Sequence, residues 1–186
     1  MNNFNFPPFP SLTTERLNLR QVNSEDEHEF YILKSDEEIL KYLEAKAKTF
    51  DEARQFMQRL NVGIAQKEWI LWGITLKDMN KLIGTICLWN YSEDYSTAEL
   101  GYELMPNYQG KGIMQEAVTT VLKYGFETMK LHLIEAVPDP YNSKSIKLLI
   151  KNKFLKEASC KGSASLDEKL TDMGIYRLTN PSLEGR

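Results

Sequence analysis

The stretch "TAELGYELMPNYQGKGIMQEAVTTV", residues 97–121, decides the fold of this chain. Its first eight residues alternate between polar and apolar side chains, as a strand with one buried face does. From Ile113 onward, apolar residues recur at helical spacing. Between the two lie Gly110, Lys111 and Gly112, where a helix usually begins with Ser, Thr, Asp or Asn. The amides of the first helical turn are therefore left to water or to an anion from outside.

Two familiar phosphate-binding loops do not match this glycine-rich segment. A P-loop has Ser or Thr after its lysine, but Lys111 is followed by Gly112. A dinucleotide loop has a third glycine at the place where this chain has Gln115. From these residues alone two interpretations stay open: a glycine-rich turn whose amides bind water, or an anion site of another kind.

The segment also belongs to a strand, helix, strand unit, at 97–104, 113–129 and 131–138. Such a unit usually places its two strands parallel, joined by a right-handed crossover. "TFDE", residues 49–52, is a capping box for a second helix, and the acidic run 24–30 is interpreted as a solvated helix start. Further strands are predicted at 14–22, 69–75, 82–89, 154–160 and 174–178, and further helices at 36–43, 49–67 and 143–151.

Length and composition indicate one globular domain. The chain has 186 residues, of which 42% are hydrophobic, enough for a sizeable core. We expect a single domain over 1–186, with an extended segment at 1–12 and a tail at 180–186. The net charge of -3 gives no general attraction for nucleic acid, and no run approaches the roughly 18 apolar residues of a membrane span. We therefore expect no nucleic-acid or membrane partner and a cytoplasmic location.

Cysteine and histidine residues give no support for a disulfide or a metal site. Cys87 lies in an apolar run and Cys160 in a polar segment, so both are expected to be reduced. His28 and His132 are far apart and lack any metal-binding spacing. We expect no metal, and neither cysteine has a flanking motif typical of a nucleophile.

Three motifs together resemble the GNAT acetyltransferases. "QGKGIM" (109–114) is similar to the Q/R-x-x-G-x-G/A pyrophosphate loop of that family, while "AELGYEL" (98–104) and "DPYNSKSIKLL" (139–149) fit its ribosomal-protein N-acetyltransferase branch. The resemblance runs from 14 to 178. It implies a single α/β domain of the GNAT type, with a mixed, mostly antiparallel twisted sheet of six or seven strands and helices on both faces. It also implies a splayed pair of strands that binds CoA.

The same resemblance implies acetyl-CoA as the acetyl donor. The pyrophosphate is expected on the backbone amides of residues 110–114, and the pantetheine along the strand that ends near Leu104. Met114 departs from the family pattern, where Gly or Ala is commoner, and should fill space beside the phosphates. The expected cofactor-binding residues are Leu104, Met105, Gln109, Gly110, Lys111, Gly112, Ile113, Met114, Asn142 and Ser145.

Acetyl transfer to an amine requires a base, because an amine is mostly protonated near neutral pH. Strand alternation puts Glu99, Gly101 and Glu103 on one face, so two carboxylates are candidates. Glu99 stands where this branch usually has Glu and is ranked first, with Glu103 second. A surface role for either residue remains open.

The leaving thiolate requires a proton or a strong hydrogen bond. Many GNAT enzymes have a Tyr seven residues after the Asn of the last motif, but here that position is Leu149. Ser145 stands where the branch has a Ser and is the candidate donor, and Asn142 is a good helix cap by residue type. The family also has Gly where this chain has Lys153, so either the turn differs or the lysine is strained.

The acceptor amine is not decided by one sequence. A protein N-terminal α-amine is first on the branch resemblance, followed by a small-molecule amine such as a polyamine, an amino acid or an aminoglycoside. A CoA-binding sensor without turnover is a third possibility. In this family the acceptor is set by segments such as 35–50 and 161–170. Trp69, Trp72 and Trp89 are expected in the core rather than at an acceptor surface, and either a monomer or a homodimer is compatible with the sequence.

Overall fold

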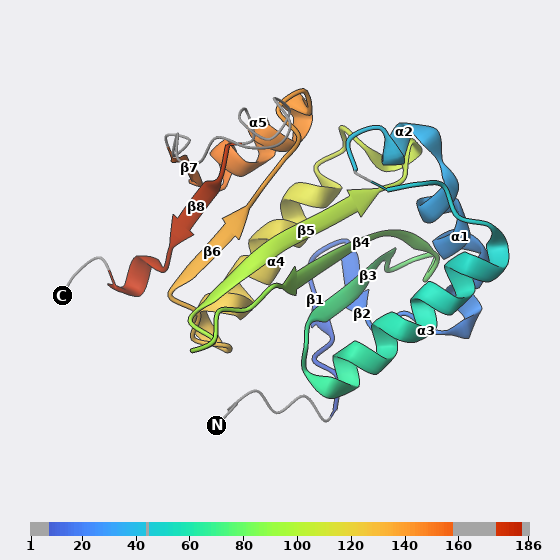
Figure 1. The fold of residues 1–186 in the computed structure, drawn as a ribbon, viewed down its shortest axis with the longest axis horizontal. Helices are drawn as coiled ribbons and strands as arrows, with labels where there is room; N and C mark the ends of the chain where they lie inside the picture. Colours follow the sequence, from blue (N-terminus) through green and yellow to red (C-terminus); the bar gives the residue numbers. More distant parts are fainter. Residues whose placement is uncertain (1–7, 44, 158–173, 184–186) are drawn as a thin grey trace, which may run out of the picture.

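A computed structural model describes residues 8–43, 45–157 and 174–183 of the chain, and these form an open twisted sheet with helices on both faces (Figure 1). The expected acceptor loop 161–170 lies outside the described residues, as does the end of the strand predicted at 154–160.

The sheet is mixed, and its strand order is β1-β2-β3-β4-β5-β6-β8-β7. The neighbouring strands are antiparallel except β5 and β6, which are parallel. The strands are β1 (Leu12–Thr13), β2 (Leu17–Arg20), β3 (Ile70–Leu76), β4 (Leu82–Trp89), β5 (Thr97–Leu104), β6 (Leu133–Ala136), β7 (Leu155–Lys156) and β8 (Tyr176–Thr179).

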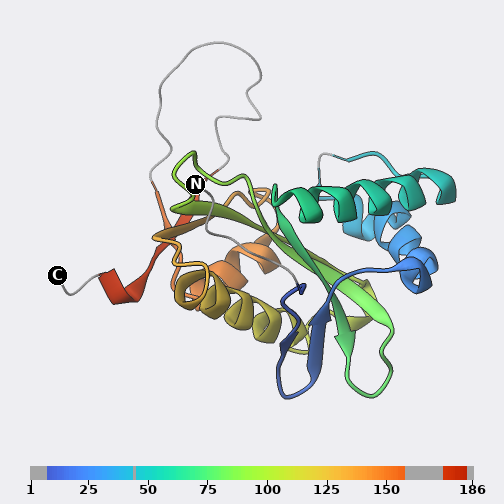
Figure 2. The same ribbon diagram turned by 90° about the horizontal axis from the view of Figure 1, so that it is seen from below.

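Helices cover the two faces of this sheet and enclose two separate hydrophobic cores. Helices α1 and α3 pack on one face, and α4 and α5 on the other, as the two views show (Figure 2). Trp72 is fully buried on the α4 side, where its ring meets Tyr124 edge-on at 5.5 Å between centroids. The helices are α1 (Glu27–Ser35), α2 (Glu37–Leu40), α3 (Phe50–Gln66), α4 (Ile113–Glu127) and α5 (Ser143–Lys151), with short 3-10 turns η1 (Ser24–Asp26), η2 (Pro106–Tyr108) and η4 (Pro181–Leu183).

Several local predictions are confirmed. The unit β5, α4, β6 is the parallel crossover that the sequence predicts. Thr49 and Glu52 form the capping box of α3, and the Asn142 side chain accepts the Ser145 amide at the start of α5. Lys153 has a φ of +70°, so the turn after α5 is kept and the lysine occupies the left-handed region that favours glycine.

Two features differ from the expectation. The described sheet has eight strands rather than six or seven, because β1 is a two-residue strand too short for a periodic signal, while β7 falls within the strand predicted at 154–160. The acidic run 24–30 is only partly solvated: Asp26 is buried in an ion pair with Arg20, and Phe30 is fully buried. The run therefore leads into α1, a helix with a buried side, which the charged pattern concealed.

Helix α3 packs at Gly63 against Trp69, the residue just before β3. The Trp69 ring packs directly on this glycine, and its Nε1 donates to the Leu60 carbonyl at 3.0 Å. A β-carbon at position 63 would overlap the indole ring. The glycine is needed here for close approach, although glycine is costly inside a helix.

We predict that Gly63→Ala destabilises the fold, against the usual helix preference for alanine. Overpacking of this kind typically costs about 1–3 kcal/mol. For a chain of this length, thermal unfolding should shift down by roughly 2–4 °C per kcal/mol. Val62→Ala, one residue away and 55% exposed, is the matched control and should leave the midpoint nearly unchanged. A raised midpoint for Gly63→Ala would contradict the packing.

Candidate active site

The site begins where two parallel strands part. β5 and β6 pair only from Thr97 to Glu99, opposite Leu133 to Glu135. β5 continues to Leu104, whereas β6 ends at Ala136 (Figure 1). Within the described residues, positions 100–104 therefore have no strand partner on the β6 side. Free backbone groups on this edge can bind an extended chain that carries amides.

The loop between β5 and α4 has backbone groups that suit an anion. Gly110 and Gly112 have φ values of +73° and +75°, which favour glycine. Gly112 is the N-cap of α4 and provides no side-chain hydrogen bond. The first-turn amides, together with the positive end of the helix dipole, thus remain available to a phosphate group.

Side chains from both sides hold this loop in place. Gln109 donates from Nε2 to the Leu104 carbonyl at 3.0 Å and accepts from Lys144 Nζ at 3.2 Å. The Arg16 guanidinium donates to the Lys111 carbonyl at 3.0 Å and to Glu116 Oε2 at 2.6 Å. The loop is therefore fixed to the end of β5, to α5 and to the β1–β2 turn.

These features fit the diphosphate and the pantetheine of CoA. A β-carbon at Gly110 would meet no atom within 4 Å, so space lies beside the loop. The ammonium groups of Lys111 and Lys144 lie on or beside it. Met114 is partly buried and packs against the core, and its place beside the phosphates stays a prediction. Its amide is left free for the anion.

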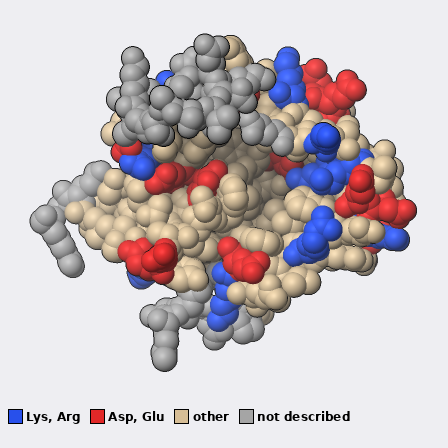
Figure 3. Space-filling view, viewed as in Figure 1, with Lys and Arg blue, Asp and Glu red and all other residues tan. Residues whose placement is uncertain are grey.

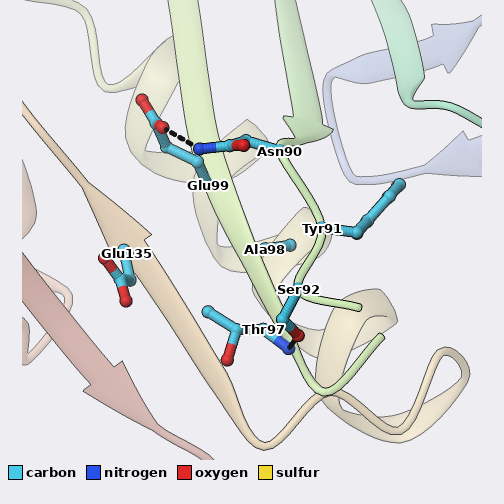
Figure 4. Close-up of a pocket in the computed structure, with 7 residues that line it drawn as sticks. All are labelled: Asn90, Tyr91, Ser92, Thr97, Ala98, Glu99 and Glu135. Carbon is cyan, nitrogen blue, oxygen red and sulfur yellow. Dashed lines mark hydrogen bonds between the residues drawn. The ribbon is translucent and has the colours of Figure 1, made fainter. Parts of the chain in front are cut away.

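Glu99 lies at the last position where β5 pairs with β6, in a pocket of about 190 Å³. Figure 4 shows its carboxylate accepting a hydrogen bond from Asn90, whose Nδ2 lies at 3.2 Å from Oε2. Partial burial raises the pKa of Glu99, the Asn90 hydrogen bond lowers it, and the nearby Glu135 charge raises it again. The pocket is lined by Asn90, Tyr91, Ser92, Thr97, Ala98, Glu99 and Glu135.

Glu103, on the same face of β5, has different surroundings. Its side chain is 6% exposed, and Oε1 accepts from Lys34 Nζ at 2.5 Å and from Thr85 Oγ1 at 2.9 Å. Lys34 also lies over the rings of Phe30 and Phe56. Glu103 is thus paired with a largely buried cation, whereas among the described contacts Glu99 has no ion pair.

A row of four residues crosses the sheet on this face. Trp89, Glu99, Glu135 and Arg177 are successive partners on β4, β5, β6 and β8. Trp89 is 43% exposed, so it is not the core residue that its apolar strand predicts. Arg177 Nε lies 3.2 Å from Glu135. In Figure 3 carboxylates lie over β5 and β6, lysines and arginines lie among further carboxylates on the α1 and α3 side, and a hollow lies between the two sides.

Cys87 lies under this face, in surroundings that do not favour a nucleophile. It is the partner of Gly101, where a β-carbon would approach its sulfur to 3.0 Å. Burial raises the pKa of the Cys87 thiol to about 12, so the reactive thiolate is scarce at neutral pH. Cys160 lies outside the described residues.

The opposite face of β5 carries a pair of hydroxyl groups. The Tyr102 phenol and the Ser145 hydroxyl are 2.7 Å apart, the first on β5 and the second in the first turn of α5. Leu149, which replaces the expected tyrosine, is fully buried in the core. The structure thus brings Ser145 and Asn142 to the opening, and it adds Tyr102 to the candidates.

Sequence reasoning missed several of these neighbours. Asn90, Glu135 and Arg16 come from other strands or turns, and only strand register brings them to Glu99 or to the loop. Tyr102 stood in the motif, and alternation alone would have placed it on the face opposite Glu99.

No helix among the described residues combines the length and the apolar character needed to cross a bilayer. Nor do the described residues include a group of three or more His, Cys, Asp or Glu arranged to hold a metal ion.

Comparison with known proteins identifies the family. Residues 16–155 match the acetyltransferase (GNAT) domain. The uncharacterized N-acetyltransferase YoaA of Bacillus subtilis (strain 168) is 30% identical over 174 residues, which cover 93% of this chain and 98% of YoaA. A GNAT-family acetyltransferase from Bacillus anthracis superposes with a TM-score of 0.78 at 28% identity, over 92% of this chain and 99% of that chain. The ribosomal-protein-S5-alanine acetyltransferase from Vibrio fischeri gives 0.76 at 25% identity, over 92% and 97%. This chain therefore belongs to the GNAT acetyltransferase family and is an acetyl-CoA-dependent N-acetyltransferase.

Proposed function

We propose that this N-acetyltransferase transfers the acetyl group directly to a protein N-terminal α-amine, with Glu99 as the base. One observation carries the proposal: Glu99 lies in a pocket at the point where β5 and β6 part, on the face of β5 opposite Ser145. A thioester at this edge would meet the amine on one side and a hydrogen-bond donor for sulfur on the other.

The CoA part of the substrate follows the loop and the free edge of β5. The diphosphate would bind the amides of residues 110–114, which a capping side chain does not occupy. The pantetheine would run along the unpaired end of β5, with the first turn of α5 as the other wall. The residues proposed to hold CoA are Leu104, Met105, Gln109, Gly110, Lys111, Gly112, Ile113, Met114, Asn142 and Ser145.

The surroundings of Glu99 suit proton removal from an amine. An α-amine has a pKa of about 7.7–8.0 and lysine one of about 10.4, so an α-amine is the easier acceptor near neutral pH. Burial raises the pKa of Glu99, which brings the base closer to the amine. Glu103 is already neutralised by Lys34, so we keep it second.

The acceptor class rests on the resemblance to ribosomal-protein N-acetyltransferases, one of which is the similar structure from Vibrio fischeri. A cationic small-molecule amine is the second candidate. It is favoured by the adjacent carboxylates of Glu99 and Glu135, since a second ammonium group would be attracted there. A CoA sensor without turnover is opposed by the presence of Glu99, Asn142 and Ser145 at one opening.

Acetyl-CoA should stabilise the chain against heat, whereas ATP and NAD at equal concentration should not. A ligand at about 100 times its Kd adds roughly 2.7 kcal/mol, which at about 2–4 °C per kcal/mol is a shift of several degrees. Gly112→Ala, with a strained φ of +75°, should reduce this shift to less than half, and Lys111→Ala should largely retain it because the amides hold the anion. An equal shift with ATP would mean a generic anion site.

Glu99→Gln should lower kcat by roughly 10²–10⁴ at neutral pH, the usual contribution of a general base, without changing the melting midpoint much. Glu103→Gln is the matched control: it leaves Lys34 without its charged partner and should mainly destabilise the fold, since removing one partner of a buried pair can cost about 3–5 kcal/mol. Release of CoA thiol is measured with an alanine-initiated peptide, spermidine, an aminoglycoside and no amine. Full turnover by Glu99→Gln would remove its role.

The acidic limb of the pH–rate profile should reflect the protonation of Glu99. Because its pKa is raised, activity should be lost as pH falls through a value above that of an ordinary Glu. Glu135→Gln removes a like charge and should move the limb to lower pH. Asn90→Gly removes a hydrogen bond to the charged form while tolerating the φ of +49°, and should move the limb to higher pH. Two shifts in the same direction would show that another group sets the limb.

A further inference from the structure

We propose that Tyr102 is a positioning residue for acetyl transfer: its phenol and the Ser145 hydroxyl form a pair whose remaining free O–H points to the departing sulfur. The inference rests on the proposed function and deepens it, because it says how the strand and helix α5 together stabilise the leaving group. It adds a residue that motif comparison did not mark.

The pair spans the opening of the site. Tyr102 Oη and Ser145 Oγ lie 2.7 Å apart, although 43 residues separate them in sequence. The last β5–β6 pair is Glu99 with Glu135, so the contact lies in the part where the two strands have separated. It joins β5 to the first turn of α5 across the path proposed for the pantetheine.

The pair differs from a single hydroxyl because the direction of its free O–H is restricted. Each group has a single O–H, and one of these is used within the pair, whichever atom donates. Among the described residues neither hydroxyl has another hydrogen-bond partner. One O–H is therefore left over, and its direction is restricted. Ser145 is further fixed because Asn142 Oδ1 accepts its amide at 3.0 Å.

The reaction requires a base for the amine and a hydrogen-bond donor for the sulfur, and β5 carries one of each on opposite faces. Glu99 and Tyr102 are three residues apart on β5, and an odd spacing puts them on opposite faces. At about 3.3 Å per residue, they lie roughly 10 Å apart along the strand. The base and the donor thus flank the same free edge. Helix α5 has no hydroxyl at Leu149, which is fully buried.

In the transfer, the amine nitrogen bonds to the carbonyl carbon, and the C–S bond breaks with its electron pair staying on sulfur. The amine proton goes to Glu99, and the thiolate finally takes a proton from water. The free O–H of the pair donates a hydrogen bond to the sulfur while it gains charge, and keeps its own proton. Burial raises the pKa of Tyr102 to about 12, so the phenol stays protonated at the pH of the assay.

Turnover of Tyr102→Phe, Ser145→Ala and the double variant tests the pair. In Tyr102→Phe the Ser145 O–H remains but is no longer directed to the sulfur. We therefore expect kcat to fall about tenfold or more, the effect of losing a hydrogen bond to a charged group, with little change in KM for acetyl-CoA. In the Ser145→Ala background the same change should cost no further than about twofold, because the residues act as a unit. Tyr124→Phe removes a phenol from α4 and is the matched control, with wild-type kcat expected.

The binding of CoA, which has no acetyl group, gives a second measurement. If the pair donates to sulfur, it favours the thiolate of CoA. The Kd ratio of desulfo-CoA to CoA, measured by calorimetry, should therefore rise by about tenfold between pH 7 and 9 in wild type. In Tyr102→Phe the ratio should stay near one at both pH values.

Unchanged kcat in Tyr102→Phe, losses that multiply in the double variant, or a Kd ratio that Tyr102→Phe leaves intact would each overturn the role of the pair. These outcomes differ from a failure of the proposed function. If Glu99→Gln loses turnover while Tyr102→Phe keeps it, only the pair is wrong. If wild type consumes acetyl-CoA with none of the amines, both proposals are overturned.

Discussion

The site depends on one constraint, the early end of pairing between the parallel strands β5 and β6. Three positions pair, up to Glu99 and Glu135, and then β5 runs on without a β6 partner in the described part of the chain. The crossover from β5 to β6 contains α4. The N-terminus of α4 therefore lies near the unpaired end of β5. The glycine-rich loop, the free backbone and the first turn of α5 thus surround one opening. If pairing continued to Leu104, the backbone groups on this edge would be taken up by β6.

Alternation along β5 then separates the surroundings of its two faces. Glu99, Gly101 and Glu103 face the side of α1 and α3, where Cys87 packs under the glycine. Leu100 and Leu104 pack into the core beneath α4, and Tyr102 reaches Ser145 from that same face. A single strand therefore presents carboxylates on one side of the opening and hydroxyl groups on the other, which agrees with separate places for an amine and a leaving thiol.

The sequence was sufficient for whatever depends on local pattern. Alternation gave β5, helical spacing gave α4, and the two glycines of the loop have the positive φ values that their residue type suggests. It was insufficient where distant segments meet. Lys34 lies 69 residues from Glu103, and Arg16 lies 95 residues from Lys111. Those contacts follow from helix packing and strand register, which no local pattern contains. The prediction that Trp89 lies in the core was wrong, because an apolar strand can end at an open surface.

The two carboxylates on β5 show how packing decides between residues that the pattern treats alike. Lys34, held over two phenylalanine rings, neutralises Glu103 and ties α1 to the sheet. Removing the charge of Glu103 would therefore leave the largely buried Lys34 ammonium without its charged partner. Among the described residues Glu99 accepts a hydrogen bond from the neutral Asn90 amide alone, and it lies beside the like charge of Glu135. Its environment therefore opposes ionisation without preventing it. Of the two carboxylates, only Glu99 has no ion pair among the described contacts, and this difference is why we propose it rather than Glu103 as the base.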